Sequence, residues 1–211
     1  MEAKKKICLI SDMAGIWFKM NESYFDKIER RIGIKDKDRK KILKILSFLK
    51  NRAREGKIST FMLGMLPYKK LKYENFVFLR EKFMDLEIKE AKKIYKLNEN
   101  ALKVLKKLHK KVLLIGISDS VLNGDRFKKL LERIGILKFF DFVFTSHDLG
   151  LQKPKVFRYF KFLSKNYKVY FLGHEDDEII GAKKFGFKTI GLRNKNADIF
   201  ISKLEDLLKI F

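Results

Sequence analysis

Short apolar segments alternate with helical segments along the second half of the chain, and this alternation constrains the fold more than any other feature. The predicted strands are residues 112–117, 140–145, 169–172 and 189–192. The predicted helices are residues 101–109, 127–134, a helix opening at Pro154, one running through Ala182, and 204–210. Repeated strand–helix units of this length predict a parallel sheet with right-handed crossovers. Functional sites of such sheets lie at the carboxyl ends of the strands.

A first predicted strand, residues 6–11, precedes a turn at residues 12–15. From about Asn21 to Leu97 apolar residues recur at helical spacing, and we expect no strand in this stretch. Within it Ser59 is expected to cap a short helix ending near Pro67, and after it Asn98 is expected to cap the helix at 101–109.

The predicted fold class is therefore α/β, with a Rossmann-like parallel sheet core flanked by helices and an all-helical cap domain inserted after the first strand. The predicted core domain comprises residues 1–18 and 95–211, and the predicted cap domain comprises residues 19–94.

The net charge is strongly positive, at +23 from 49 Lys and Arg against 26 Asp and Glu. Such a field attracts nucleic acid, anionic lipid or phosphorylated substrates. However, the lysines are spread along the chain and Gln152 is the only glutamine, which is typical of hyperthermophile proteins. We therefore interpret the charge as compositional, and nucleic acid is not the expected partner.

The single cysteine, Cys8, lies in an apolar run, which excludes a disulfide framework and favours a reducing compartment. Residues 1–6 resemble the basic start of a signal peptide, but Ser11 and Asp12 cut the following apolar stretch short. No segment approaches the roughly 18 uncharged apolar residues of a membrane helix. We expect a cytoplasmic protein that does not associate with membranes.

Polar residues follow four of the predicted strands. Asp12 follows the first, and the second leads to Ser118, Asp119 and Ser120. The third leads to Lys153, and the fourth to the acidic run at residues 173–178. Each of these alone is as readily a turn residue, a helix cap or a solvated charge. Their placement in order, each after a buried strand, indicates a joint site.

These segments resemble the four motifs of the haloacid dehalogenase-like superfamily, whose helical cap is inserted just after the first motif. The most specific stretches are residues 135–146 and 150–154, which are similar to the third motif and its approach. Residues 181–186 and 197–201 are similar to later segments of the family. The resemblance covers nearly the whole chain.

The resemblance implies a role for each motif residue. Asp12 would be the nucleophile, Ser118 the hydroxyl that hydrogen-bonds the transferring group, and Lys153 the cation that balances its charge. Asp119 and Ser120 would help to bind the substrate phosphate. A carboxylate attacks a phosphoryl group only where cations and donors cancel their repulsion, which agrees with these roles.

The resemblance also implies a Mg²⁺ cofactor. Asp12 and the backbone carbonyl of Ala14 would bind it, since Mg²⁺ prefers oxygen ligands. In the fourth motif the usual Gly-Asp is Gly173-His174, so His174 and Glu178 stand where the family has carboxylates. Imidazole suits zinc, nickel or cobalt better than magnesium. We expect Asp176 and Asp177 to supply the missing metal ligands and His174 to lie nearby.

A second departure lies in the first motif. The family's phosphatases carry an Asp that acts as acid and base two residues after the nucleophile, and this chain has Ala14 there. Losing a general acid-base group costs about 10²–10⁴ in rate. An Ala at this position resembles phosphonoacetaldehyde hydrolases, whose cap lysine forms a Schiff base. Lys50 is the nearest candidate for that lysine, although a solvated helix face explains it better.

The predicted function is a hydrolase, a Mg²⁺-dependent phosphatase of small phosphorylated metabolites that works through an aspartyl intermediate. The loss of the acid at Ala14 favours substrates with good leaving groups. A phosphonoacetaldehyde hydrolase-like enzyme and a catalytically impaired binding protein of the same fold are the alternatives. A monomer or homodimer is expected.

Overall fold

The computed structural model describes residues 6–211, except for the side chains of Glu22 and Phe61, so residues 1–5 of the predicted core lie outside the described residues. Its centre is a six-stranded sheet in the order β5-β4-β1-β6-β7-β8, in which every neighbouring pair is parallel. The strands are β1 (Lys6–Asp12), β4 (Leu113–Ser118), β5 (Phe142–Thr145), β6 (Tyr167–Gly173), β7 (Lys188–Leu192) and β8 (Ile199–Ile201). The predicted fold class is confirmed.

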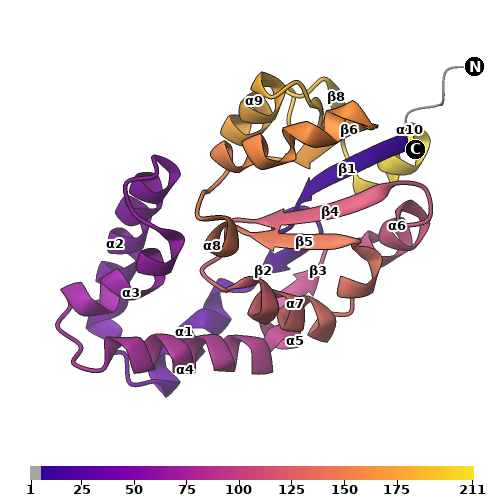
Figure 1. The fold of residues 1–211 in the computed structure, drawn as a ribbon. Helices are drawn as coiled ribbons and strands as arrows, with labels where there is room; N and C mark the ends of the chain where they lie inside the picture. Colours follow the sequence, from indigo (N-terminus) through magenta and orange to yellow (C-terminus); the bar gives the residue numbers. More distant parts are fainter. Residues whose placement is uncertain (1–5) are drawn as a thin grey trace, which may run out of the picture.

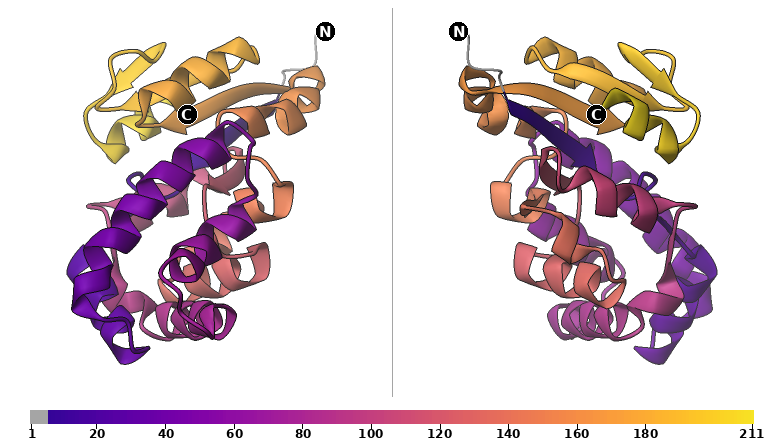
Figure 2. Two further views of the ribbon diagram at one scale, coloured as in Figure 1. Left: turned by 90° about the vertical axis from the view of Figure 1, so that its left-hand side faces the viewer. Right: turned by 90° about the vertical axis from the view of Figure 1, so that its right-hand side faces the viewer.

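Helices cover both faces of this sheet (Figures 1 and 2). One face packs against α6 (Ala101–Leu108), α7 (Gly124–Arg133) and α10 (Leu207–Ile210). The other packs against the 3₁₀ helix η2 (Lys155–Lys165) and α9 (Asp176–Lys184). Shorter turns complete this part of the chain: η1 (Leu137–Phe139), α8 (Ser146–Leu149) and η3 (Leu204–Asp206).

The alternation of side chains along β1 explains why helices cover both faces of the sheet. Leu9 packs in the cluster of buried side chains on the α6 and α7 face, whereas Cys8 and Ile10 pack against η2 and α9. All three side chains are fully buried. Successive side chains of a strand point to opposite faces, so a strand buried on both sides is apolar throughout. The continuous run of apolar residues in β1 therefore fixes its place at the centre of the sheet.

Five helices lie between β1 and α6 in the sequence, and they form the helical insertion: α1 (Glu22–Arg31), α2 (Asp36–Arg54), α3 (Thr60–Lys70), α4 (Phe76–Lys89) and α5 (Ala91–Ile94). The insertion has a small apolar cluster of its own, built on Ile32, Ile34, Ile42 and Tyr68. Ser59 caps α3 as predicted, accepting a hydrogen bond from the Met62 N–H at 3.3 Å. In Figure 1 α2 and α3 stand opposite the ends at which β1, β4 and β5 terminate.

Two short strands lie where the chain passes into and out of the helical insertion, and both were missed. β2 (Phe18–Met20) and β3 (Tyr95–Leu97) pair in antiparallel fashion. The expectation of an uninterrupted helical pattern up to Leu97 is therefore wrong at its end. The predicted division into core and cap domains stays a prediction, and this strand pair lies at its proposed boundary.

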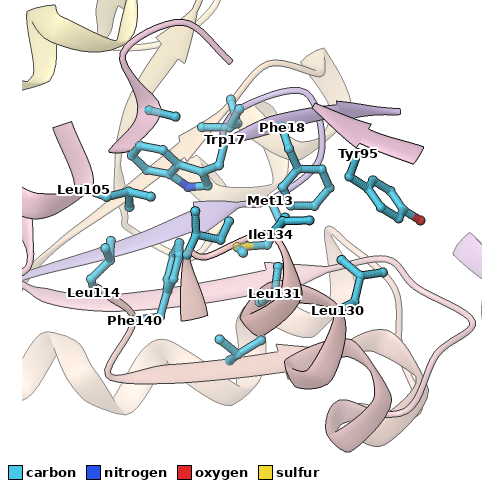
Figure 3. Packing of buried hydrophobic residues seen from close by; sticks show 14 of the residues in the cluster. Met13, Trp17, Phe18, Tyr95, Leu105, Leu114, Leu130, Leu131, Ile134 and Phe140 are labelled. Atoms are coloured by element: carbon cyan, nitrogen blue, oxygen red, sulfur yellow. The ribbon is translucent and has the colours of Figure 1, made fainter. Parts of the chain in front are cut away.

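Aromatic packing and one asparagine hold the β2–β3 strand pair against the core. Phe18 and Tyr95 lie edge to face at 5.3 Å between ring centroids, and Figure 3 shows the two rings next to each other. The side chain of Asn98 donates to the carbonyls of Gly15 and Ile16, at 2.8 and 2.7 Å. Asn98 therefore ties down the turn after β1. It does not cap α6 as predicted, because the capping position of α6 is Asn100.

The start of η2 depends on close packing with α9. A Cβ atom on Gly181 would lie 2.0 Å from Cβ of Pro154, far inside van der Waals contact. Only glycine therefore lets α9 approach the loop that carries Lys153. The predicted helix after Pro154 exists, but as a 3₁₀ helix.

We predict that Gly181→Ala lowers the free energy of unfolding by about 1–3 kcal/mol, because the added methyl overpacks the contact with Pro154. Urea denaturation measures the change. Lys184→Ala, at an exposed position of the same helix, is the matched control and should change stability by less than about 0.5 kcal/mol. Equal stability of the two variants would show that the close approach is not required.

Candidate active site

The Asp12 carboxylate lies at the carboxyl end of β1 and is almost completely buried, with 4% of the residue exposed. Asp12 stands beside Ile117 of β4 in the parallel register. The preceding residue, Ser11, accepts a hydrogen bond from the Trp17 indole N–H at 2.8 Å, and Trp17 is itself fully buried. The turn after β1 is thus anchored from within the core, which fixes the direction of the Asp12 side chain.

Lys153 reaches Asp12 from the loop before η2. Its side chain is 2% exposed, and its ammonium contacts Oδ1 of Asp12 and lies 2.8 Å from Oε1 of Glu178. The backbone N–H of Lys153 donates to the Asp119 carboxylate at 3.1 Å, which fixes the loop against the end of β4. A buried ammonium is tolerated only when it is paired, so this cation and its two carboxylates form one unit.

His174 approaches the other oxygen of the same carboxylate. It follows β6, and its Nδ1 atom lies 3.3 Å from Oδ2 of Asp12, without the alignment of a hydrogen bond. The ring rests on the backbone of Gly15, where an added Cβ atom would lie 2.6 Å from Cε1 and Nε2. Gly15 also has φ of +82°, a conformation that favours glycine. The turn after Asp12 is therefore shaped to accept the His174 ring.

The charges of this cluster shift the pKa of each member. Burial raises the pKa of the Asp12 carboxyl, but Lys153 and His174 outweigh burial and hold that pKa below its usual value. Contact with Asp12 raises the pKa of His174 despite partial burial. Burial likewise lowers the pKa of Lys153, but Asp12 and Glu178 outweigh it and raise the pKa. Asp12 is thus kept as a carboxylate between the Lys153 ammonium and the His174 imidazole.

Glu178 behaves in the opposite way. It is buried on the first turn of α9, and its Oε2 atom has no hydrogen-bond partner among the described residues. Burial outweighs the attraction of Lys153 and raises the pKa of Glu178 to about 7. Burial also raises the pKa of Asp119. The cluster therefore carries less negative charge near neutral pH than its number of carboxyl groups suggests.

Two hydroxyl residues, Ser118 at the end of β4 and Ser120 in the following turn, make no hydrogen bond to Asp12 among the described residues. Ser118 follows Ile117, the residue beside Asp12, and is 6% exposed. Among the described residues its hydroxyl makes no hydrogen bond, so it is available to a substrate. Ser120 instead accepts from the Leu122 N–H at 3.1 Å, which shapes its own turn. The expected substrate contacts of Ser118, Asp119 and Ser120 stay predictions.

Asp176 and Asp177 direct their carboxylates to other partners. Asp176 accepts from the Asn194 side chain at 2.8 Å, and the same amide donates to the His174 carbonyl at 3.1 Å. Asp177 pairs with Arg54 at 3.1 Å. The residues of the fourth motif that face Asp12 and Lys153 are His174 and Glu178. The spacing of His174 and Glu178 matches that of the two carboxylates of the family, but the predicted metal ligands were Asp176 and Asp177 instead.

The residues around Asp12 therefore do not fit a magnesium site. Within residues 6–211, no group of three or more His, Cys, Asp or Glu side chains is arranged to hold a metal ion. The expected ligands Asp176 and Asp177 are bound elsewhere, and the His174 ring lies over the backbone that follows Ala14. An imidazole is also a poor ligand for Mg²⁺.

Arg54 of the helical insertion contacts the acidic turn at the start of α9, and sequence reasoning missed it. It ends α2 and pairs with Glu175 at 2.6 Å and Asp177 at 3.1 Å, on either side of the turn that leads into α9. Lys50, the predicted Schiff-base lysine, is exposed one turn earlier on the same helix. The sequence could have pointed to Arg54, because residues four apart share a helix face and Arg54 lies four residues after Lys50.

The sequence of residues 65–192 matches the family described as haloacid dehalogenase-like hydrolase. This match covers more than half of the chain, and the protein belongs to that family of hydrolases. The predicted family is thereby confirmed. No match is found among curated proteins. In the described part of the chain, no helix combines the length and the apolar character needed to cross a membrane.

Solved structures share the fold over nearly the whole chain. The HAD-hydrolase YfnB from Bacillus subtilis, bound to magnesium, has a TM-score of 0.74 at 20% identity, covering 98% of this chain and 99% of that one. L-2-haloacid dehalogenase from Xanthobacter autotrophicus has 0.69 at 16%, covering 97% and 98%. A predicted phosphoglycolate phosphatase from Haemophilus somnus has 0.62 at 19%, covering 98% of each. At these identities the likeness shows the fold alone.

We predict that Glu178→Gln changes the pH dependence of stability. The pKa of Glu178 is raised to about 7, so the folded state holds a proton that the unfolded state has lost, and wild-type stability falls as pH rises from about 4.5 to 7. Gln cannot titrate, so the stability of the variant relative to wild type should increase across that window. Urea denaturation at several pH values measures the difference in stability between the two proteins. A difference that does not change with pH would contradict the raised pKa of Glu178.

We predict that Arg54→Ala loosens α2 with little effect on global stability. Partly exposed ion pairs contribute about 0–1 kcal/mol each. Amide hydrogen exchange in residues 36–54 should become faster, because one of the links between the insertion and the core is lost. Arg52→Ala, at an exposed position of α2, is the matched control. If both variants exchange like wild type, the pairs of Arg54 do not hold the insertion in place.

Proposed function

We propose that the protein hydrolyses small anionic substrates by transferring a group onto the Asp12 carboxylate. The observation that carries this proposal is the nearly complete burial of Asp12 between the ammonium of Lys153 and the imidazole of His174. A buried carboxylate is costly unless it is paired. Its low pKa keeps it deprotonated and therefore able to act as a nucleophile at neutral pH.

In the proposed reaction an Asp12 oxygen forms a bond to the electrophilic centre, and the leaving group departs with the electron pair of the bond that breaks. Water then cleaves the new ester or acyl phosphate, which restores Asp12. Lys153 balances the charge of Asp12 and of the group being transferred. The unbonded hydroxyl of Ser118, at the end of the neighbouring strand, is a donor for the same group.

Ala14 limits the choice of substrate. No acid stands at this position to protonate a departing alkoxide. The leaving group must therefore be stable as an anion, as in acyl or aryl phosphates, and these small phosphorylated compounds are the leading substrates. The expected Mg²⁺ dependence is not part of the proposal, because the residues around Asp12 do not fit that ion.

Halide displacement from a small 2-haloacid is the second candidate. It is favoured by the same Ala14 position and by the lack of a metal cluster among the described residues, since a halide leaves without a proton or a metal. The fold likeness to an L-2-haloacid dehalogenase agrees with it. A Schiff-base reaction loses support, because Lys50 is exposed and the neighbouring Arg54, which pairs with Glu175, carries a guanidinium that does not form an imine with an aldehyde.

We predict that Asp12→Asn lowers turnover by a factor on the order of 10⁴ or more, because the amide is not a nucleophile. The assay is release of phosphate from acyl and aryl phosphates and of halide from 2-haloacids. Asp125→Asn, at an exposed position of α7, is the matched control and should keep wild-type turnover. Intact-mass spectra of rapidly quenched wild type should show the covalent adduct, and those of Asp12→Asn should not.

The result decides between the candidates. Phosphate release identifies a phosphatase, and halide release a dehalogenase. Phosphonoacetaldehyde belongs in the same panel. Turnover of no compound by the wild-type protein would favour the binding-protein alternative, and turnover unchanged by Asp12→Asn would overturn the mechanism.

A further inference from the structure

We propose that the His174 imidazole takes the place of a divalent cation beside Asp12, so that the site works without a metal ion. This inference rests on the proposed function, because it concerns the group that faces the Asp12 carboxylate during the reaction. It does not depend on which anionic substrate is used.

The first argument is steric. A cation shared by Asp12 and the Ala14 carbonyl would have to lie between the Asp12 carboxylate and the turn that follows it. The His174 ring lies there: its Nδ1 is 3.3 Å from Oδ2 of Asp12, and its other edge rests on Gly15. Two heavy atoms of the ring lie 2.6 Å from the position that a Gly15 Cβ would take. The ring and a hydrated cation compete for one space.

The second argument is the chemistry of the donors. A divalent cation needs several oxygen ligands, and the Asp12 oxygens already contact Lys153 and lie beside His174. The remaining nearby carboxylate, Glu178, faces the Lys153 ammonium at 2.8 Å. The Lys153 ammonium thus lies against one oxygen of Asp12, and a cation placed beside it would meet repulsion rather than a ligand.

The third argument is that the position of His174 is held by the fold. The amide of Asn194, a residue that is 6% exposed, donates to the His174 carbonyl at 3.1 Å. The same amide donates to Asp176 at 2.8 Å, which keeps that carboxylate away from Asp12. The same amide therefore fixes the backbone of His174 and removes a candidate metal ligand.

The Lys153 ammonium and the His174 imidazole both face the Asp12 carboxylate. Among the described residues Nδ1 of His174 has no hydrogen-bond partner, so the imidazole is available to an anionic substrate at Asp12. A preorganised donor or cation near developing charge contributes a factor on the order of 10²–10³ to kcat. His174 would therefore supply the electrostatic stabilisation that a bound metal ion supplies in metal-dependent sites.

Two measurements test the inference, and the first does not require activity. Isothermal titration calorimetry of metal-free wild type with Mg²⁺, Mn²⁺, Co²⁺ and Zn²⁺ should show no binding that depends on Asp12, judged against Asp12→Asn. His174→Asp replaces the ring with a shorter carboxylate and should gain Mg²⁺ binding. His174→Asn removes the ring without adding a charge and should not gain it. Circular dichroism checks that each variant folds.

The second measurement is turnover in the presence of EDTA, using whichever substrate the panel identifies. Wild type should keep its full rate, His174→Asn should lose a factor on the order of 10², and His174→Asp should recover with Mg²⁺. The inference is overturned if EDTA abolishes wild-type turnover and Mg²⁺ restores it. It is also overturned if wild type binds a metal through Asp12, or if folded His174→Asp gains no binding. Failure of Asp12→Asn to reduce turnover would instead overturn the proposed function, and leaves the calorimetric result unaffected.

Discussion

The contact between Asp12 and Lys153 is the interaction on which the rest of the site depends. The two residues are 141 positions apart in sequence and both are almost fully buried. Removing one partner of a buried ion pair costs about 3–5 kcal/mol, because the other charge is left uncompensated. The pair therefore requires β1 and the loop before η2 to keep their relative positions, and several contacts of the core fix those positions. Trp17 and Asn98 fix the turn after β1, and Gly181 lets α9 close on Pro154.

The parallel sheet explains why such distant residues meet. Four segments end at the same edge of the sheet, and each contributes one chemically useful group: a carboxylate at the end of β1, a hydroxyl at the end of β4, an ammonium after β5 and an imidazole after β6. This convergence was predictable, because strand–helix alternation fixes the side of the sheet on which sites lie. Asp12, Ser118 and Lys153 were identified from their positions after buried strands, and the contact of Lys153 with Asp12 agrees with that assignment.

Other features depend on tertiary structure and could not be deduced. The strands β2, β3 and β8 have three residues each, too few for a periodic pattern, and they exist because a partner strand is present. The choice between Asp176, Asp177 and Glu178 depends on where α9 begins, since each residue turns a side chain by about 100° around the helix axis. With the helix starting at Asp176, the buried face contains Glu178, Ile179 and Ala182. The role of Arg54 required the position of α2 relative to the sheet.

The central claim is that Asp12 is a nucleophile held between the side chains of Lys153 and His174, with His174 where a metal ion would otherwise lie. A crystal structure of the protein soaked with Mg²⁺ and tungstate, a phosphate mimic, tests it most directly. The account predicts tungstate in contact with Asp12, Lys153 and Ser118, the His174 ring still on Gly15, and no cation density at Asp12. An octahedral ion bound by Asp12 and the Ala14 carbonyl, with His174 displaced, would contradict it.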